Sequence, residues 1–317
     1  MAKIKIHPEL RRKGLMLKIF SIPSGSLWVK LLCMLTTLTR GKHGDDTHYE
    51  QVYISRADGT TLRICVYTPL TPVEDAPGLL WIHGGGYFLG APEQDENDYI
   101  KRFINWGAGV VVAPDYTKSV VKPYPAALED CYAALLWLKE NGGKYGMRPD
   151  QIFVGGDSAG GGLTAALSFY ARDRAEVDIA FQMPLYPMID DRPTESNTGN
   201  NAPLWNSKTN KFGWRLYLGE LYSTGNVPVY AAPARATDYS NLPPTCSFVG
   251  DIEPFYDETL AYMENLRKAG IETHFKVFEG CFHAFNMMCP KSSVAKEATA
   301  LLETTFKYAV QNFYSKV

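Results

Sequence analysis

The residues best suited to chemistry lie in one glycine-rich turn, Gly156-Asp157-Ser158-Ala159-Gly160. An apolar, strand-like run, 151–154, precedes this turn, and an Ala- and Leu-rich, helix-like run follows it. A Gly-x-Ser-x-Gly between a strand and a helix is typical of a nucleophile elbow, which lifts the serine hydroxyl clear of the sheet. The glycines lack the Cβ atoms that would clash where the strand turns back. Ser158 is therefore the predicted nucleophile, and the Ala159 amide, at a helix N-terminus, is a predicted oxyanion donor.

A second glycine loop, His83-Gly84-Gly85-Gly86, follows another apolar run, 78–82. Bare backbone amides in such a loop form the other half of an oxyanion hole, and we expect Gly84 and Gly85 to supply them. His83 could be taken for a base or a metal ligand. An isolated histidine beside glycines is expected instead to orient the loop through hydrogen bonds.

Together the two glycine motifs resemble the hormone-sensitive-lipase-like family of α/β-hydrolases, from about residue 50 to the C-terminus. The resemblance implies the α/β-hydrolase fold: a mostly parallel eight-stranded central sheet flanked by helices, with a helical cap. It implies a carboxylesterase of the acetyl esterase kind, a serine ester hydrolase for short acyl chains. Residues 1–48 and 190–230 are assigned to the cap, and 49–189 and 231–317 to the core.

A serine nucleophile needs a base, and the base needs a carboxylate that fixes its tautomer. The chain order in this fold is serine, acid, histidine. His283 is the predicted base, because it follows the last expected strand and its loop, with Gly280, resembles the family's Gly-x-x-His-x-Phe. His274 is a poor rival, because it lies within that strand.

Three carboxylates compete for the role of the acid. The run from Glu253 to Glu258 is similar to the family's Asp-Pro-Leu-x-Asp-Glu, which places Glu253 where the acid is usually Asp. Asp251, nearer the strand end, is the alternative acid, and Asp257 is a third candidate. A carboxylate that is not hydrogen-bonded to the histidine is expected to cap the following helix or to interact favourably with the dipole at its N-terminus. This chemistry requires no metal and no cofactor.

The segments that must position these residues alternate between strand and helix, as a parallel sheet requires. The first two strands, joined by the turn 57–59, are expected to enter the sheet antiparallel. Expected strands are 51–56, 61–68, 78–82, 109–113, 151–154, 179–185, 243–250 and 273–278. Expected helices are 95–106, 126–140, 159–171, a segment within 205–221, one that ends at Gly270, and 294–313.

Three stretches leave alternatives open. After Asp115-Tyr116 the family's Arg-Leu-Ala-Pro-Glu is replaced by the run 117–121, so the rim of the pocket can differ from that of the family. Asp115 itself is expected to anchor the loop structurally. The apolar face of 26–38 predicts a helix, and the family resemblance implies that it lies in the cap over the active site, with packing on the body or on a membrane surface as alternatives. The aromatic residues around Trp205 and Trp214 either line an acyl pocket or form plain core.

Composition limits the other classes of function. The 317 residues carry a net charge of -2, so the sequence lacks the excess of basic residues that is typical of nucleic-acid binding. The six cysteines are scattered without Cys-x-x-Cys spacing, which predicts free thiols, no structural zinc and a reducing compartment. The segment 26–38 is too short to span a bilayer, and we do not expect a membrane as a partner. We expect a cytoplasmic protein with a small-molecule ester substrate and leave a homodimer open.

Two other functions on this fold stay open. One is a small-ligand binding protein similar to the plant gibberellin receptors, which resemble the same family but lack the catalytic histidine; His283 argues against it. The other is an amidase or formamidase, because acyl transfer by a serine does not distinguish an ester from an activated amide. A long-chain lipase is less favoured, because the chain shows no evident interfacial lid.

Overall fold

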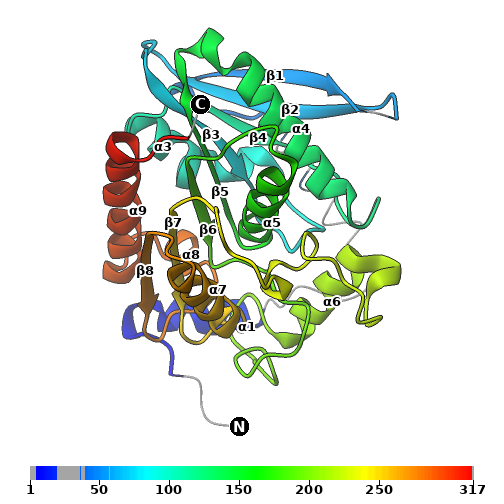
Figure 1. Cartoon of the computed structure of the whole chain (residues 1–317). Coiled ribbons are helices and arrows are strands. Elements are labelled where there is room, and N and C mark those ends of the chain that lie inside the picture. Colours follow the sequence, from blue (N-terminus) through cyan, green and yellow to red (C-terminus); the bar gives the residue numbers. More distant parts are fainter. Residues whose placement is uncertain (1–4, 20–35, 37–39, 57, 316–317) are drawn as a thin grey trace.

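The computed structural model describes residues 5–19, 36, 40–56 and 58–315. One eight-stranded sheet runs through the described chain in the order β1-β2-β4-β3-β5-β6-β7-β8 (Figure 1). The strands are β1 Thr47–Ser55, β2 Thr61–Pro69, β3 Ala76–Ile82, β4 Val110–Pro114, β5 Met147–Asp157, β6 Phe181–Leu185, β7 Thr245–Gly250 and β8 Thr273–Phe278. The pair β1 and β2 and the pair β2 and β4 are antiparallel, and the remaining pairs are parallel. The predicted α/β-hydrolase fold, with its antiparallel entry, is confirmed.

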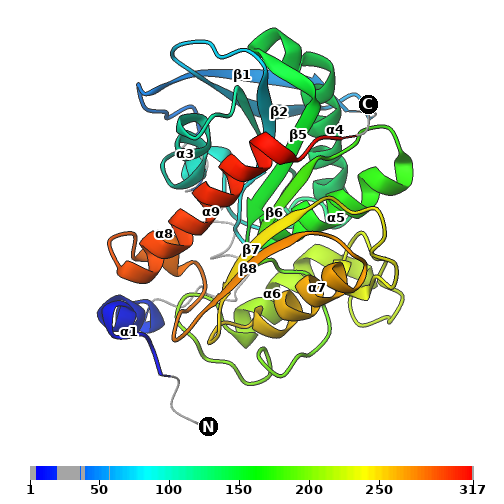
Figure 2. The same ribbon diagram turned by 60° about the vertical axis from the view of Figure 1, so that its left-hand side comes forward.

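Helices connect the parallel strands and cover both faces of the sheet (Figures 1 and 2). The α-helices are α1 Arg11–Ile19, α3 Lys101–Asn105, α4 Ala126–Asn141, α5 Ala159–Arg174, α6 Ser207–Leu218, α7 Tyr256–Lys268, α8 Phe285–Met288 and α9 Ser293–Asn312. The 3-10 helices are Pro8–Leu10, Pro92–Asp95, Gly142–Tyr145, Gly219–Leu221 and Pro233–Arg235, and Glu96–Ile100 is a π-helix. The crossover helices bring the carboxyl ends of the parallel strands to one edge of the sheet, where sites form in open α/β sheets.

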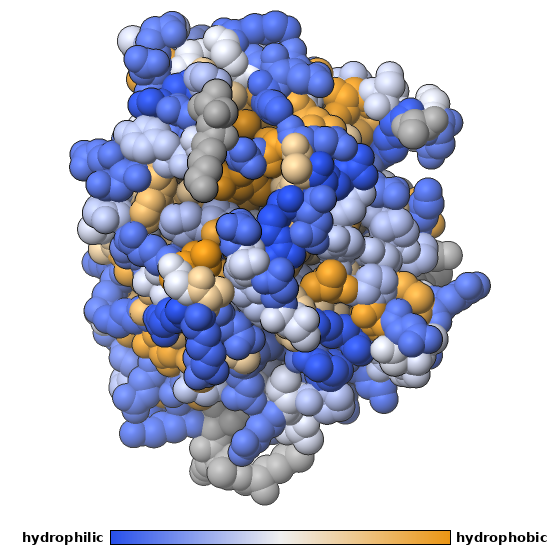
Figure 3. Space-filling model, viewed as in Figure 1, coloured by the Kyte–Doolittle hydropathy of each residue, from blue (hydrophilic) through white to orange (hydrophobic). Residues whose placement is uncertain are grey.

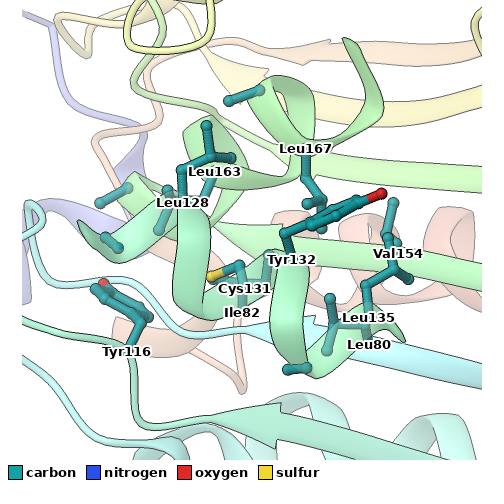
Figure 4. Packing of buried hydrophobic residues seen from close by; sticks show 14 of the residues in the cluster. Leu80, Ile82, Tyr116, Leu128, Cys131, Tyr132, Leu135, Val154, Leu163 and Leu167 are labelled. Carbon is teal, nitrogen blue, oxygen red and sulfur yellow. The ribbon is translucent and has the colours of Figure 1, made fainter. Parts of the chain in front are cut away.

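Side-chain alternation along the central strands builds two hydrophobic cores, one on each face. Leu80 and Ile82 of β3 face the core under α4 and α5, whereas Leu79 and Trp81 face the core under α3 and α9. Figure 4 shows the first core, in which Leu80, Ile82 and Val154 of the sheet meet side chains of α4 and α5. The central strands are largely apolar and buried on both faces, as expected for a parallel sheet.

Most of the expected elements appear within a few residues of their predicted bounds, and the expected helix 95–106 is helical but is not one regular α-helix. This segment instead contains the end of a 3-10 turn, the π-helix and the short α3. The buried carboxylates of Asp95 and Glu96 explain the break. Asp95 accepts a hydrogen bond from Trp81 Nε1 at 2.8 Å, and Glu96 accepts one from the Gly44 amide at 2.8 Å.

On the face seen in Figure 3 hydrophilic residues predominate, and apolar areas lie between them. Within the described ranges, no helix has the length and apolar character needed to cross a bilayer. The predicted N-terminal helix, 26–38, falls outside the described residues, with the exception of residue 36.

Candidate active site

Ser158 occupies a strained corner between β5 and α5. Its backbone has φ 56° and ψ -116°, a conformation that L-residues seldom adopt and that is common at functional turns. The turn packs so closely on β3 that a Cβ atom on Gly160 would lie 1.9 Å from the carbonyl oxygen of Ile82. Only glycine fits there, so the Gly-x-Ser-x-Gly pattern has the steric cause that the sequence suggested.

His283 reaches this serine from the loop between β8 and α8. Its Nε2 lies 2.8 Å from Ser158 Oγ, and its Nδ1 is hydrogen-bonded to Glu253 Oε2. The aromatic rings of Tyr186 and Phe255 pack edge-on against the imidazole, each with a centroid distance of 5.0 Å. Because rings on two sides restrict its rotation, the imidazole is held in the plane that joins the hydroxyl to the carboxylate.

Of the three candidate acids, Glu253 is the one placed against His283. It is fully buried, and its second oxygen accepts a hydrogen bond from the Gly250 amide at 3.0 Å. The carboxylate of Asp251 instead accepts from the Gly280 amide at 2.6 Å, and that of Asp257 accepts from the Ser196 amide at 2.6 Å. Asp251 thus braces the loop that carries the histidine, and Asp257 ties the helix start to a neighbouring loop.

The glycine loop differs from expectation at its first glycine. The Gly84 amide donates to Asp157 Oδ1 at 2.9 Å, so the prediction that it faces an oxyanion is wrong for this structure. Gly85, with φ 122°, and Gly86, with φ 61°, adopt conformations that favour glycine. Among the described residues, the amides of Gly85, Gly86 and Ala159 donate to no acceptor. The sequence analysis did not single out Gly86, although it lies in the same loop.

Asp157, the residue before the serine, belongs to a buried pair of carboxyl groups. Asp95 and Asp157 lie within hydrogen-bond distance of each other. Burial raises the pKa of Asp157 to about 6, although the hydrogen bond with Asp95 and the charge of His283 lower it. Burial raises the pKa of Asp95 as well. Two carboxylates in contact cannot both ionise cheaply, so the pair shares one proton. The pattern Gly-x-Ser-x-Gly gives no signal for this pairing.

His83 and Asp115 have the structural roles that were predicted for them. His83 is buried, and its Nδ1 lies 2.7 Å from the carbonyl oxygen of Gly84. Asp115 is ion-paired with Arg63 at 3.0 Å and Lys118 at 3.2 Å. Burial alone would raise the pKa of Asp115, but the charges of Lys118, Arg40 and Arg63 outweigh it and lower the pKa to about 2. The anchoring carboxylate therefore stays ionised at neutral pH.

The aromatic residues of the region 202–218 differ in their contacts. The Trp205 ring lies 6.1 Å from the His283 ring, and a Cβ atom on Gly86 would meet Trp205 at 2.2 Å. Trp214 packs instead on Tyr87 at 5.7 Å and on Tyr217 at 6.0 Å. Both tryptophans are part of the buried core, and Trp205 is the one that also lies beside the glycine loop and the histidine.

The described residues contain no cluster of three or more His, Cys, Asp or Glu side chains that could hold a metal ion. Five cysteines are free thiols, and Cys33 lies outside the described residues. Fold and contacts together thus define a protein of the α/β-hydrolase class, with a serine, a histidine and a carboxylate in contact.

Comparisons with known proteins agree with this class. A family model described as alpha/beta hydrolase fold matches residues 79–287. The chain is 34% identical over 239 residues to the esterase LipI of Mycobacterium tuberculosis, and this aligned region covers 74% of each protein. It is 32% identical over 248 residues to the carboxylesterase NlhH of the same species, and this aligned region covers 76% of this chain and 77% of that one. A solved bacterial heroin esterase superimposes with a TM-score of 0.86 at 30% identity, over 96% of this chain and 98% of that one. The chain belongs to the hormone-sensitive-lipase-like family of α/β-hydrolases.

Proposed function

We propose that this protein hydrolyses short-acyl carboxylic esters through Ser158, His283 and Glu253 as a catalytic triad. That the chain is an ester-hydrolysing enzyme follows from its family and from the esterases it is similar to. The observation that carries the mechanism is the unbroken contact from Ser158 Oγ through both nitrogens of His283 to Glu253. Serine triads occur with either aspartate or glutamate as the acid, so a glutamate in this position suits the role.

The first half of the reaction acylates the serine. His283 Nε2 accepts the proton of the Ser158 hydroxyl while the oxygen attacks the ester carbonyl. Glu253 accepts the Nδ1 proton of His283 in a hydrogen bond and stabilises the imidazolium that forms. The imidazolium then gives its proton to the departing alcohol, and the acyl group remains on Ser158. In the second half, water takes the place of the alcohol, and the same steps release the acid.

The tetrahedral oxyanion needs donors that are fixed before the reaction begins. We propose that the amides of Gly85 and Ala159 supply them, and that Gly86 replaces Gly84 as the third donor. In support, these amides make no hydrogen bond within the described chain, whereas the Gly84 amide is taken by Asp157. Ala159 also begins α5, whose N-terminus favours negative charge.

A preference for small acyl groups is supported by the crowding around the histidine. Trp205, Tyr186 and Phe255 all lie within a few ångströms of His283, and all three are buried. Large rings at the reacting centre leave limited space for a long chain. We also propose that the cap consists of 1–48 and 190–230, which places Trp205 in its second part.

The test is hydrolysis of nitrophenyl esters from acetate to decanoate by the wild type, Ser158→Ala and Ser168→Ala. Ser168 is a matched control, since it is also buried in α5 but donates only to the Thr164 carbonyl within that helix. We expect turnover that is fastest on the short esters, lost in Ser158→Ala and kept in Ser168→Ala. A folded Ser158→Ala variant with wild-type turnover would disprove the assignment.

An amidase or formamidase is the second candidate, because the proposed serine, base and donors would serve an activated amide equally well. The ester series run beside the matching nitroanilides separates the two. Faster turnover of the anilides would favour the amidase. A folded wild type that hydrolysed neither esters nor anilides would favour the ligand-binding alternative. The contact between His283 and Ser158 argues against that alternative.

A further inference from the structure

Lys118 lies in the stretch that departs from the family's pattern, and it reaches the glycine loop. Its ammonium nitrogen lies 3.1 Å from His83 Nε2, 3.2 Å from Asp115 Oδ1 and 2.6 Å from the carbonyl oxygen of Tyr116. The side chain is 13% exposed, and the ammonium also stands over the Tyr116 ring at 4.1 Å. An ammonium group has three N–H donors, so these three contacts occupy all of them.

The ammonium determines which nitrogen of His83 carries the proton. Because a lysine ammonium can only donate, His83 Nε2 must accept, and the proton of the neutral ring lies on Nδ1. Burial, followed by the charge of Lys118, lowers the pKa of His83 well below its ordinary value, so the ring stays neutral. Nδ1 then donates to the carbonyl oxygen of Gly84, 2.7 Å away.

The Gly84 carbonyl and the Gly85 amide belong to one planar peptide group. In a trans peptide the C=O and N–H bonds point in opposite directions, so holding the carbonyl on one side directs the amide to the other. We propose that Lys118 is a positioning residue of the oxyanion hole: it holds His83 in the Nδ1-protonated tautomer and so aims the Gly85 amide at the reacting oxygen. This inference rests on the proposed function.

The neighbouring peptide group is held in a similar way. The Tyr116 hydroxyl donates to the His83 carbonyl at 3.1 Å, and the Gly84 amide at the other end of that peptide donates to Asp157. Tyr116 also stacks on the His83 ring, with centroids 4.3 Å apart and planes 13° from parallel. With this peptide and the ring held, the Lys118 ammonium at Nε2 and the Gly84 carbonyl at Nδ1 favour the same tautomer of His83.

Lys118→Met keeps the length and apolar stem of the side chain but removes the donor. The Gly85 amide matters when the oxyanion forms, so we expect kcat to fall about ten- to hundredfold with KM within about twofold of wild type. That range lies below the hundred- to thousandfold loss of an entire donor, because the amide would be misdirected and not absent. Lys122→Met, four residues on at an exposed position, is the matched control and should leave kcat unchanged.

A double variant separates positioning through His83 from a general structural effect. In His83→Asn, the asparagine Nδ2 takes the place of the imidazole Nδ1 and needs no lysine to fix a tautomer. Lys118→Met should therefore cost less than about threefold in kcat in that background. An equal loss in both backgrounds, or a folded Lys118→Met with wild-type kcat, would overturn the proposal.

The tautomer can be read without any turnover, from the ring nitrogen chemical shifts of His83 in protein labelled with 15N-histidine. The wild type should show a protonated Nδ1 and an unprotonated Nε2, and Lys118→Met should show a mixture of tautomers. A protonated Nε2 in the wild type would overturn the inference. Should the wild type hydrolyse no ester, the proposed function fails, and the nitrogen shifts still decide whether Lys118 sets the tautomer.

Discussion

Glu253 is hydrogen-bonded through Oε2 to Nδ1 of His283, whereas Asp251, two residues earlier, is bonded to the backbone of the histidine loop. Glu253→Gln should therefore lower kcat by about ten-thousand-fold, as loss of the triad charge does elsewhere, because the amide cannot stabilise the imidazolium. The measurement is kcat on nitrophenyl acetate for purified, folded variants.

Asp251→Asn is the matched control for that carboxylate. Its amide oxygen can still accept from the Gly280 amide, so kcat should stay within a few-fold of wild type and stability should change little. If Asp251→Asn lost activity as severely as Glu253→Gln, the acid would have been assigned to the wrong residue.

The pair of carboxyl groups at Asp95 and Asp157 should make stability depend on pH. Burial raises both pKa values, so the folded state binds its proton more tightly than the unfolded chain does. This stabilisation is complete below pH 4; the part from Asp157 is lost as the pH rises through about 6, the pKa of Asp157, and the part from Asp95, whose pKa burial raises well above its ordinary value, is lost at higher pH. In Asp95→Asn, the amide can donate to Asp157 at every pH while its oxygen accepts from Trp81 Nε1.

We therefore expect Asp95→Asn to match the wild type near pH 4 and to exceed it at pH 8 by on the order of 1 to 3 kcal/mol in free energy of unfolding. Urea unfolding across that pH range measures the difference. Asp46→Asn, at a side chain that is 80% exposed, is the control and should follow the wild-type curve. A difference that did not grow with pH would contradict the shared proton.

The sequence predicted what local patterns encode. Ser158, His283 and Glu253 each lie in a short motif that can be recognised from the neighbouring residues. The structure brings these three side chains together. The occupied Gly84 amide and the broken helix around Asp95 escaped prediction for a single reason. The Gly84 amide is taken by Asp157, and the segment around Asp95 is bonded to Trp81 and to Gly44, so both features depend on contacts between different chain segments, which leave no periodic signal.

Trp205 should limit the length of the acyl chain. It stands beside His283 and the glycine loop, so Trp205→Leu should raise the ratio of kcat/KM for octanoate to that for acetate several-fold. Trp214→Leu is the control, since it shrinks an equally buried tryptophan that packs on Tyr87 in the core. Both variants should lose about 2 kcal/mol of stability or more. Equal shifts in the ratio for both variants would exclude a specific role for Trp205.

The close approach of α5 to β3 gives a last prediction, at Gly160. A Cβ there would lie 1.9 Å from the Ile82 carbonyl oxygen and 2.7 Å from that of His83, both backbone atoms that cannot turn away. Gly160→Ala should push the elbow off the sheet, cost about 3 kcal/mol or more in urea unfolding and lower kcat, because Ser158 and the glycine loop move apart. Gly143→Ala, where a Cβ meets nothing within 4 Å, should be neutral or slightly stabilising. A Gly160→Ala protein with the wild-type unfolding midpoint and kcat would show that this contact does not position the nucleophile.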